Sequence, residues 1–298
     1  MIAGPFITRF APSPTGHLHL GHLVNAIYVW GVARARQGQV RLRIEDHDRE
    51  RFRPEYEESI LDDLEWLGLL PDAPLIGEVR ADPAVARQSG RPERYHTALR
   101  ALDDRGLVFW CDCSRQRIER TGGGVGGELR YDGCCRGRGL GPGPACGVRV
   151  RIEPGTERFV DGLLGAQAQD PAAQCGDFLV RDRVGQWTYQ FAAAVDDLVD
   201  GITHVIRGQD LLASTGRQIR LARMLGRETP PVFIHHPLVL GPTGEKLSKS
   251  RGDAGLREAR RSGMTAEDLI GRAAHAVGLI PAPRPIRPPE LASLVTRI

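Results

Sequence analysis

The chain has 298 residues, of which 41% are hydrophobic and 26% charged, as in soluble globular proteins rather than disordered or fibrous ones. Its formal net charge of +3 permits a polyanionic partner without demanding one. No stretch approaches the ~20 consecutive apolar residues of a membrane span, and the N-terminus lacks a signal-peptide pattern, so we expect a cytoplasmic protein with no membrane partner. In that compartment the six cysteines are more typical of metal ligands or buried apolar residues than of a disulfide framework.

The first seventy residues are predicted to form a strand, loop, helix and strand. Residues 5–10 form a short buried strand, and the Pro/Gly-rich loop APSPTGHLHLGH leads into an apolar helix over 23–35 and a second strand over 40–46. Such a βαβ unit implies a parallel sheet, with its ligand at the carboxyl ends of the strands and the N-terminus of the helix. A further helix over 54–67 opens with a proline and acidic residues in its first turn.

The middle of the chain has a different composition. Proline, glycine and cysteine increase between 71 and 185, which predicts an inserted region with its own small fold. Alternating strands and helices resume at 203–208, 214–225 and 231–240, and the tail contains one helix over 265–277. We therefore divide the chain into a first half of an α/β domain (1–70), an insertion (71–185), the second half of that domain (186–255) and a short helical tail (256–298).

The first loop carries the pattern PxPxGxxHxGH, which begins at Pro12 and ends at His22. The imidazoles of His19 and His22, close to a helix N-terminus, can both donate hydrogen bonds to phosphate oxygens, and the helix dipole favours anions there. Gly21 lets a flat base approach the backbone closely. These features predict a nucleotide-phosphate site.

The only two lysines of the chain, Lys246 and Lys249, lie three residues apart in TGEKLSKS, whereas the other 38 basic residues are arginine. A polar surface loop could carry such a sequence, but the concentration of both lysines in one loop indicates a need for a compact ammonium group. An ammonium binds phosphate as a point charge, a role for which the rigid guanidinium fork is less suited.

Together, HLGH near the N-terminus and KLSKS near the C-terminus resemble the two signature motifs of class I aminoacyl-tRNA synthetases. This resemblance implies a Rossmann-like parallel sheet, split by an insertion, that binds ATP with Mg²⁺. It further implies catalytic roles for His19, His22, Lys246 and Lys249, and ATP contacts from Pro12, Gly21, His22 and Lys249.

The strand ends suggest the second substrate. Arg9, Glu45 and Arg207 each end a predicted strand, and two guanidinium groups with one carboxylate suit a ligand with one ammonium and two carboxylates, which is glutamate or aspartate. The segments RFAPSPTGHLHLGH, LRIEDHD, TYQFAAAVDD and HVIRGQDLLASTGRQ are similar to segments of glutamyl-tRNA synthetases, which favours L-glutamate. That resemblance implies glutamate contacts from Arg9, Ser13, Glu45, Tyr189 and Arg207.

Two cysteine clusters flank the glycine-rich tract TGGGVGGE and could close a tetrahedral zinc site. The combination WCDCSR and YDGxC resembles the family of glutamyl-Q tRNA(Asp) synthetases, and it implies one structural Zn²⁺ on Cys111, Cys113, Tyr131 and Cys135. Tyrosine is an uncommon zinc ligand, however, so Cys134 remains an alternative to Tyr131.

The same resemblance implies a function. Glutamate is activated as its adenylate and transferred to queuosine in the anticodon loop of tRNA(Asp), by a monomer whose arginine-rich insertion holds the tRNA. Only 48 residues follow Ser250, fewer than the helical anticodon-binding region of a full glutamyl-tRNA synthetase needs. The alternatives are a compact glutamyl-tRNA synthetase that charges a tRNA 3′ end, a glutamate ligase that acts on a protein or small acceptor, and a non-catalytic tRNA-binding protein.

Overall fold

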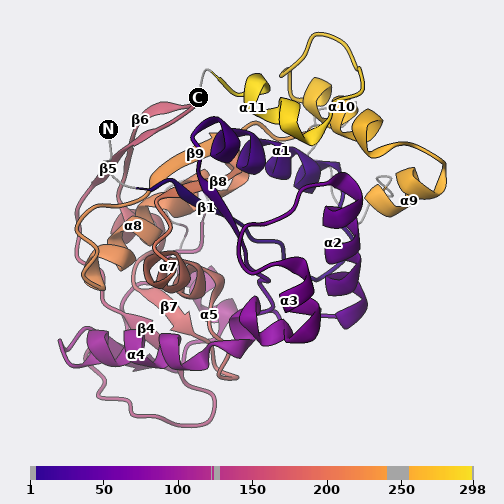
Figure 1. The fold of residues 1–298 in the computed structure, drawn as a ribbon. Coiled ribbons are helices and arrows are strands. Elements are labelled where there is room, and N and C mark those ends of the chain that lie inside the picture. The colour runs from indigo at the N-terminus through magenta and orange to yellow at the C-terminus, as the bar shows by residue number, and fades with distance from the viewer. Residues whose placement is uncertain (1–4, 122, 124–127, 240–254, 297–298) are drawn as a thin grey trace. The chain divides into compact units, whose positions relative to one another are not determined.

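The computed structural model describes residues 5–121, 123, 128–239 and 255–296, and the chain divides into two compact units (Figure 1). The first unit comprises Met1–Gly90, Ile202–Leu211 and Pro231–Ile298, and the second comprises Arg91–Gly201 and Leu212–Pro230. Neither unit is one continuous segment, because the chain passes between them four times.

The first unit is built on parallel strands. Strand β1 (Ile7–Phe10) pairs in parallel with β2 (Gln39–Leu42), and β8 (His204–Gly208) pairs in parallel with β9 (Val232–His236). Thr203 joins the two pairs, since its hydroxyl accepts from the Ile7 N–H at 2.8 Å and its own N–H donates to the Ile7 carbonyl at 2.9 Å. The predicted parallel arrangement is confirmed for these strands.

Helix α1 (Leu20–Ala35) forms the centre of the hydrophobic core of this unit. Helices α10 (Ala266–Ala276) and α11 (Leu291–Leu294) lie beside it (Figure 1). A Cβ on Gly31 would lie 3.0 Å from the Leu291 carbonyl oxygen, so a glycine in α1 permits this close approach. The final turns of the described chain therefore complete a core that begins at Phe10.

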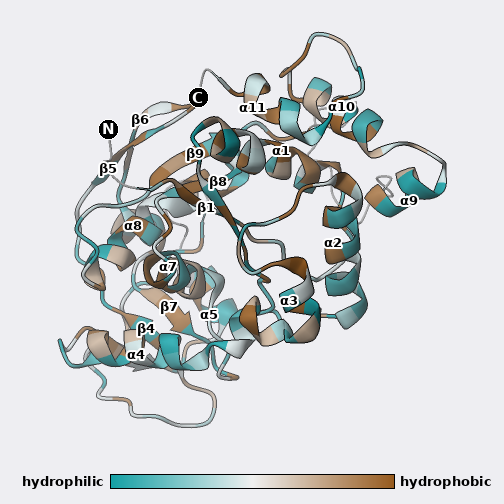
Figure 2. Ribbon diagram, viewed as in Figure 1, coloured by the Kyte–Doolittle hydropathy of each residue, from teal (hydrophilic) through white to brown (hydrophobic). Residues whose placement is uncertain are grey.

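Helix α2 (Pro54–Leu67) has the bounds that the sequence predicts, with proline in its first turn and Gly68 in the left-handed conformation at its end. Hydrophilic and hydrophobic residues both occur along it (Figure 2). The buried face includes Ile60, Leu64 and Leu67. Other helical elements described in the first unit include α3 (Ile76–Ala81), α9 (Leu256–Arg261) and the short 3₁₀ turns Pro83–Val85, Gln88–Gly90 and Pro288–Glu290; a further 3₁₀ helix, Gln209–Ser214, begins in it.

One acidic residue on α2 is buried. Asp63 is 3% exposed, and its Oδ2 has no hydrogen-bond partner among the described residues. Burial raises the pKa of this carboxyl to about 6, against a smaller opposing attraction from Arg260. The folded protein therefore holds the proton of Asp63 more tightly than the unfolded chain does. As the pH rises from about 4 through 6, the free energy of unfolding decreases, because the folded protein must bury a charged carboxylate.

Replacing Asp63 with asparagine should therefore stabilise the protein at pH 7.5, by up to about 3 kcal/mol, and should have little effect at pH 4. Urea unfolding at the two pH values would measure the difference. Asp62 is the control, because it is 54% exposed and pairs with Arg80 at 2.7 Å. An equal effect of D63N at both pH values would contradict the burial argument.

The second unit has a three-stranded antiparallel sheet in the order β3 (Val108–Cys111), β4 (Gly147–Val150) and β7 (Phe178–Arg181). Tyr95, Phe178 and Phe191 belong to its core. The remaining elements are α4 (Pro92–Asp103), α5 (Arg115–Thr121), α6 (Pro171–Cys175), α7 (Tyr189–Val199), α8 (Thr215–Met224) and the antiparallel hairpin of β5 (Glu157–Asp161) and β6 (Gly165–Gln169).

The boundaries of the compact units differ from the predicted segment boundaries. Residues 71–90 belong to the first unit, because the Leu42 N–H donates to the Ala73 carbonyl at 2.9 Å and the Ile44 N–H to the Ala86 carbonyl at 2.9 Å. Helix α7 belongs to the second unit, and the tail belongs to the first. None of the helices in the described part of the chain combines the length and apolarity that a bilayer crossing requires.

Candidate functional site

The two histidines of HLGH cap the helix that they introduce. His19 is the N-cap of α1, its Nδ1 accepts from the Gly21 N–H at 3.1 Å, and His22 Nδ1 accepts from the His19 N–H at 3.1 Å. The ring centroids lie 3.9 Å apart. This reciprocal arrangement is a capping box built from imidazoles, so α1 begins at Leu20 rather than at the predicted residue 23.

The capping bonds determine which ring nitrogens can donate. Because both Nδ1 atoms accept backbone hydrogen bonds, a neutral ring at either position carries its proton on Nε2. The first turn of α1 contains no acidic side chain that would repel an anion. A Cβ on Gly21 would lie 3.0 Å from His19 Cε1, so glycine leaves room for the imidazole of His19. This helix end can thus present two N–H donors to an anion.

Lys246 and Lys249 lie outside the described residues. The chain after their loop returns to the HLGH segment, since the N–H of Leu256, the first residue of α9, donates to the Leu18 carbonyl at 3.1 Å.

Arg9 and Arg207 are both buried, at 5% and 4% exposure, near the ends of neighbouring strands. The Ile206 carbonyl accepts from Arg9 Nη1 at 3.5 Å and from Asn25 Nδ2 of α1 at 3.2 Å. Arg207 donates from Nε to His235 Nε2 at 3.0 Å and from Nη2 to the Leu211 carbonyl at 3.2 Å. The structure thus brings two predicted glutamate-binding guanidinium groups to adjoining strands.

Glu45 is held at the same end of the sheet. Its N–H donates to the Pro12 carbonyl at 3.0 Å, which joins it to the HLGH loop, and its buried carboxylate pairs with Arg43 at 2.9 Å. Ser13 lies in that loop, half-buried, with its carbonyl accepting from the Thr15 N–H at 2.9 Å. Tyr189 belongs to the second unit, as the first residue of α7.

Several residues around these side chains escaped sequence reasoning. Asn25 interrupts the apolar stretch of α1, and its Nδ2 also contacts His236 Nε2 at 3.1 Å. His236 Nδ1 contacts the Pro237 carbonyl at 2.9 Å, and burial lowers the pKa of this histidine, so it is neutral with its proton on Nδ1. The sequence did contain a signal that could have identified these residues, because they are polar residues within the hydrophobic segments LVNAIYVW and PVFIHH.

The cysteine cluster of the second unit is a small buried core of its own, composed of Phe109, Cys111, Cys113, Tyr131 and Cys135. The sulfur atoms of Cys111, Cys113 and Cys135 all lie within 4.8 Å of one another. Cys113 Sγ lies 3.6 Å from Cys135 Sγ, close to the separation of about 3.8 Å that a tetrahedral Zn²⁺ imposes on its sulfur ligands. The donor set therefore fits a zinc ion.

Tyr131 closes the cluster. Its hydroxyl oxygen accepts from the Cys135 N–H at 2.9 Å, and the guanidinium of Arg149 lies 3.9 Å from the centre of its ring. Burial raises the pKa of the Tyr131 hydroxyl and of the Cys113 thiol. Burial acts in the same direction on Cys135, but hydrogen bonds with Tyr131 and Arg138 outweigh it and lower the pKa of that thiol to about 7. Cys135 thus supplies thiolate at neutral pH, the form that binds metal.

A glycine fixes the position of Tyr131. The Tyr131 N–H donates to the Cys175 carbonyl at 3.0 Å, and Gly176, at a φ of 67°, would place a Cβ 2.1 Å from the Tyr131 carbonyl oxygen. We expect Gly176→Ala to destabilise the second unit by more than about 2 kcal/mol, since it adds a backbone clash at a residue with φ of 67° and ψ of −148°, a conformation that favours glycine. Thermal unfolding would measure the loss.

Gly106 is the matched control for this substitution. It has a φ of 66° but no atom within 4 Å of an added Cβ, so Gly106→Ala should cost only about 1 kcal/mol. Equal losses for the two variants would mean that the clash with Tyr131 has no energetic effect.

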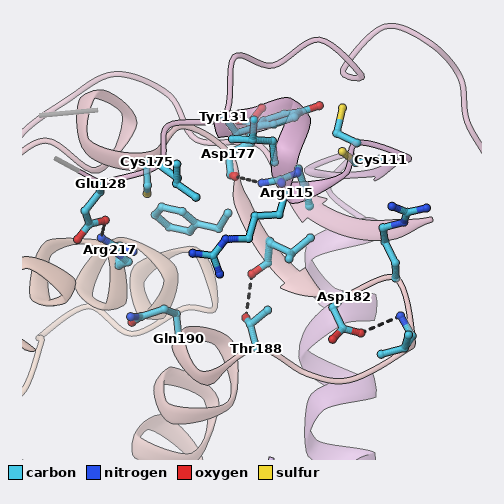
Figure 3. A pocket seen from close by; sticks show the side chains of 18 residues that line it. Cys111, Arg115, Glu128, Tyr131, Cys175, Asp177, Asp182, Thr188, Gln190 and Arg217 are labelled. Carbon is cyan, nitrogen blue, oxygen red and sulfur yellow. Dashed lines mark hydrogen bonds and ion pairs between the residues drawn. The ribbon is translucent and has the colours of Figure 1, made fainter. Parts of the chain in front are cut away.

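A cavity of about 670 Å³ lies beside the cluster within the second unit. Cys111 lies toward one end of it and the ion pair of Arg217 with Glu128 toward the other (Figure 3). Thr188 and Gln190, which flank Tyr189, also line it. The cavity therefore connects the environment of the cysteine cluster with the start of α7.

Comparison with known proteins gives a consistent result. The family model for class I tRNA synthetases (E and Q), catalytic domain, matches residues 6–270. A glutamyl-Q tRNA(Asp) synthetase of Bordetella bronchiseptica is 46% identical over 84% of this chain and 77% of its own length. A glutamate–tRNA ligase of Frankia casuarinae is 39% identical over 88% of this chain but only 54% of its own length.

The solved structure of a glutamate tRNA ligase from Elizabethkingia meningosepticum, in complex with its amino acid, superposes with a TM-score of 0.73 at 27% identity. The superposition covers 91% of this chain and 60% of that one, so the chain spans little more than half the length of the glutamate–tRNA ligases it matches. The α/β fold, the HLGH helix cap and these similarities agree. The chain is therefore a ligase that belongs to the class I tRNA synthetases of the glutamyl and glutaminyl type, with glutamyl-Q tRNA(Asp) synthetases among its relatives.

Proposed function

We propose that this protein activates L-glutamate with ATP and transfers it to the queuosine base in the anticodon loop of tRNA(Asp). The observation that carries the activation step is the imidazole-capped end of α1, which adjoins buried guanidinium and carboxylate groups. The choice of acceptor is supported by the 46% identity to a protein named for that acceptor.

In the activation step, the glutamate carboxylate attacks the α-phosphorus of ATP and pyrophosphate leaves. No general base is needed, because the nucleophile is already ionised. His19 and His22 donate Nε2–H hydrogen bonds to the phosphate oxygens on which charge develops, and Lys246 and Lys249 neutralise the leaving pyrophosphate. Pro12 and Gly21 shape the backbone against the nucleotide, and Mg²⁺ accompanies ATP as a cosubstrate.

Glutamate is recognised by opposite charges at the strand ends. Arg9 and Arg207 pair with its carboxylates, and Glu45 accepts from its ammonium group. Ser13 and Tyr189 complete the contacts. Both guanidinium groups are buried, so the site should favour glutamate over glutamine, whose neutral amide cannot form the second charge-assisted hydrogen bond.

The metal and the acceptor belong to the second unit. Cys111, Cys113, Tyr131 and Cys135 hold one structural Zn²⁺, which orders a segment whose core has only five buried side chains. Arginines around the 670 Å³ cavity, including Arg115 and Arg183, contact tRNA phosphates.

The test uses labelled glutamate and tRNA from which the 3′-terminal adenosine has been trimmed, so that 3′ charging is impossible while the queuosine diol stays intact. Two tRNA pools are compared, one with and one without queuosine. Label on the trimmed, queuosine-containing pool alone is the expected result. Absence of label there, with exchange between ATP and pyrophosphate intact, would refute the proposed acceptor.

The second candidate is charging of a tRNA 3′ end, which is favoured by the 39% identity to a glutamate–tRNA ligase. Untrimmed tRNA without queuosine separates the two functions, since only a true synthetase labels it. A ligase for a protein or small acceptor would show glutamate-dependent exchange but label neither tRNA pool.

A further inference from the structure

The cysteine cluster contains a fifth donor that the three-cysteine set and Tyr131 do not use. Cys134 Sγ lies 3.4 Å from Cys113 Sγ, 3.9 Å from Cys135 Sγ and 3.7 Å from the Tyr131 hydroxyl oxygen. Tetrahedral zinc with Zn–S bonds of about 2.3 Å separates its sulfur ligands by about 3.8 Å. Cys134 thus stands at ligand spacing from two thiols, and beside the phenol that would otherwise be the fourth ligand.

The backbone holds this sulfur in place. Gly133 adopts a φ of 81°, and the Cys134 N–H donates to Asp132 Oδ1 at 3.1 Å. The next N–H, of Cys135, donates to the Tyr131 hydroxyl oxygen at 2.9 Å. The tight turn over residues 131–135 therefore brings the Tyr131 hydroxyl and the thiols of Cys134 and Cys135 close together.

Cys134 also differs from its neighbours in exposure. Cys111, Cys113 and Cys135 are buried, whereas Cys134 is half-buried and lines a second cavity of about 480 Å³. The guanidinium groups of Arg117, Arg138 and Arg183 line that cavity too. A zinc ion with four thiolates carries a net charge of −2, which these cations would partly offset. Arg138 contacts Cys135 Sγ at 3.3 Å, but it also pairs with Asp112 of the same cavity at 2.6 Å.

We propose that the metal site has two exchangeable fourth ligands, Tyr131 and Cys134, so that the ion is retained when either one is removed. The inference rests on the proposed zinc site and adds Cys134 to its ligands. Thiolate is the more usual zinc ligand, while the Tyr131 hydroxyl oxygen is positioned beside the thiols by the Cys135 N–H that it accepts at 2.9 Å. The two donor atoms are 3.7 Å apart, and Cys134 is not among the three thiols that all lie within 4.8 Å of one another, so exchange requires the ion and the Cys134 side chain to move toward each other.

The experiment is a Co²⁺ titration of metal-free full-length protein, with wild type, Tyr131→Phe, Cys134→Ser and the double variant. Cys175→Ser is the control, because Cys175 Sγ contacts the Pro171 carbonyl at 3.3 Å rather than the cluster. We expect one equivalent of Co²⁺ in both single variants and at least about 10–100-fold weaker binding in the double variant. The thiolate-to-cobalt charge-transfer band should be stronger in Tyr131→Phe than in Cys134→Ser, because four thiolates then bind instead of three.

The outcomes separate the two proposals. If either single variant binds Co²⁺ as weakly as the double variant, the ligands do not exchange and the inference is wrong, although the zinc site stands. If the double variant binds as tightly as wild type, three cysteines suffice and the inference is again wrong. Failure of wild type to bind Co²⁺ would refute the zinc site itself. Circular dichroism of each variant checks that a loss of metal is not a failure to fold.

Discussion

Replacing His22 with asparagine is expected to reduce glutamate-dependent ATP–pyrophosphate exchange by about 10²–10³-fold, the usual effect of removing one donor to a developing oxyanion. An asparagine oxygen can still accept the His19 N–H that His22 Nδ1 accepts at 3.1 Å, so the cap of α1 remains. What is lost is the Nε2–H donor. The substitution thus separates the structural role of the ring from its catalytic one.

His17 provides the matched control, two residues before the capping pair. Its Nδ1 contacts Ser59 Oγ at 2.9 Å, and its ring packs edge-on against Tyr56. His17→Asn should change exchange by less than about tenfold, with a similarly small loss of stability. If His22→Asn kept wild-type exchange, or if the two variants lost activity equally, His22 would have no special role in phosphate binding.

Replacing Cys113 with serine is expected to weaken metal binding strongly and to destabilise the segment around it, even though Cys111, Cys134, Cys135 and Tyr131 remain. Cys113 is the thiol closest to two other sulfurs, at 3.4 and 3.6 Å. A structural zinc contributes roughly 10–16 kcal/mol of apparent binding free energy in small domains, more than five buried side chains can replace. Metal analysis and hydrogen exchange of strand β3 and residues 128–138 would detect the loss.

Cys175→Ser is again the control, because burial raises the pKa of that thiol to about 11 and its Sγ donates to the carbonyls of Pro171 and Gly176. We expect this variant to keep its metal. Normal metal content and unchanged exchange rates in Cys113→Ser would show that Cys113 is not a required ligand. Adding a chelator to the wild type should reproduce the Cys113→Ser result without any substitution.

The sequence predicted the elements whose signals are local. Helix α2 combines a proline start, a 3.6-residue hydrophobic period and a terminal glycine, and its predicted bounds are those observed. Helix α10 lies within the predicted range 265–277, and Thr265 caps it, with its hydroxyl accepting from the Asp268 N–H at 3.1 Å. The parallel pairing of β1 with β2 follows from the βαβ order.

Long-range pairing was less accessible to sequence reasoning. Strands β3, β4 and β7 have four residues each and are separated by tens of residues, so no local sequence pattern predicts that they pair in one sheet. The early start of α1 was missed because histidine is not among the usual capping residues. The salt bridge of Arg43 with Glu45 could not be predicted from the sequence. The strand period places the two side chains on the same face, but it does not show whether they pair with each other or with other residues.

The core around α1 also bears on how the protein is synthesised. Leu23 and Ile27 on this helix belong to the same core as Ile286, Leu291 and Val295, which leave the ribosome more than 250 residues later. At a synthesis rate of about 5–20 residues per second, roughly 10–50 s pass between the synthesis of the N-terminal βαβ unit and that of the C-terminal residues that pack against it. Residues 91–230 contain all of the second unit, so that unit can reach its native state first. We therefore expect nascent chains to expose an incomplete hydrophobic face on α1 during this interval, which makes it a natural binding site for a ribosome-associated chaperone.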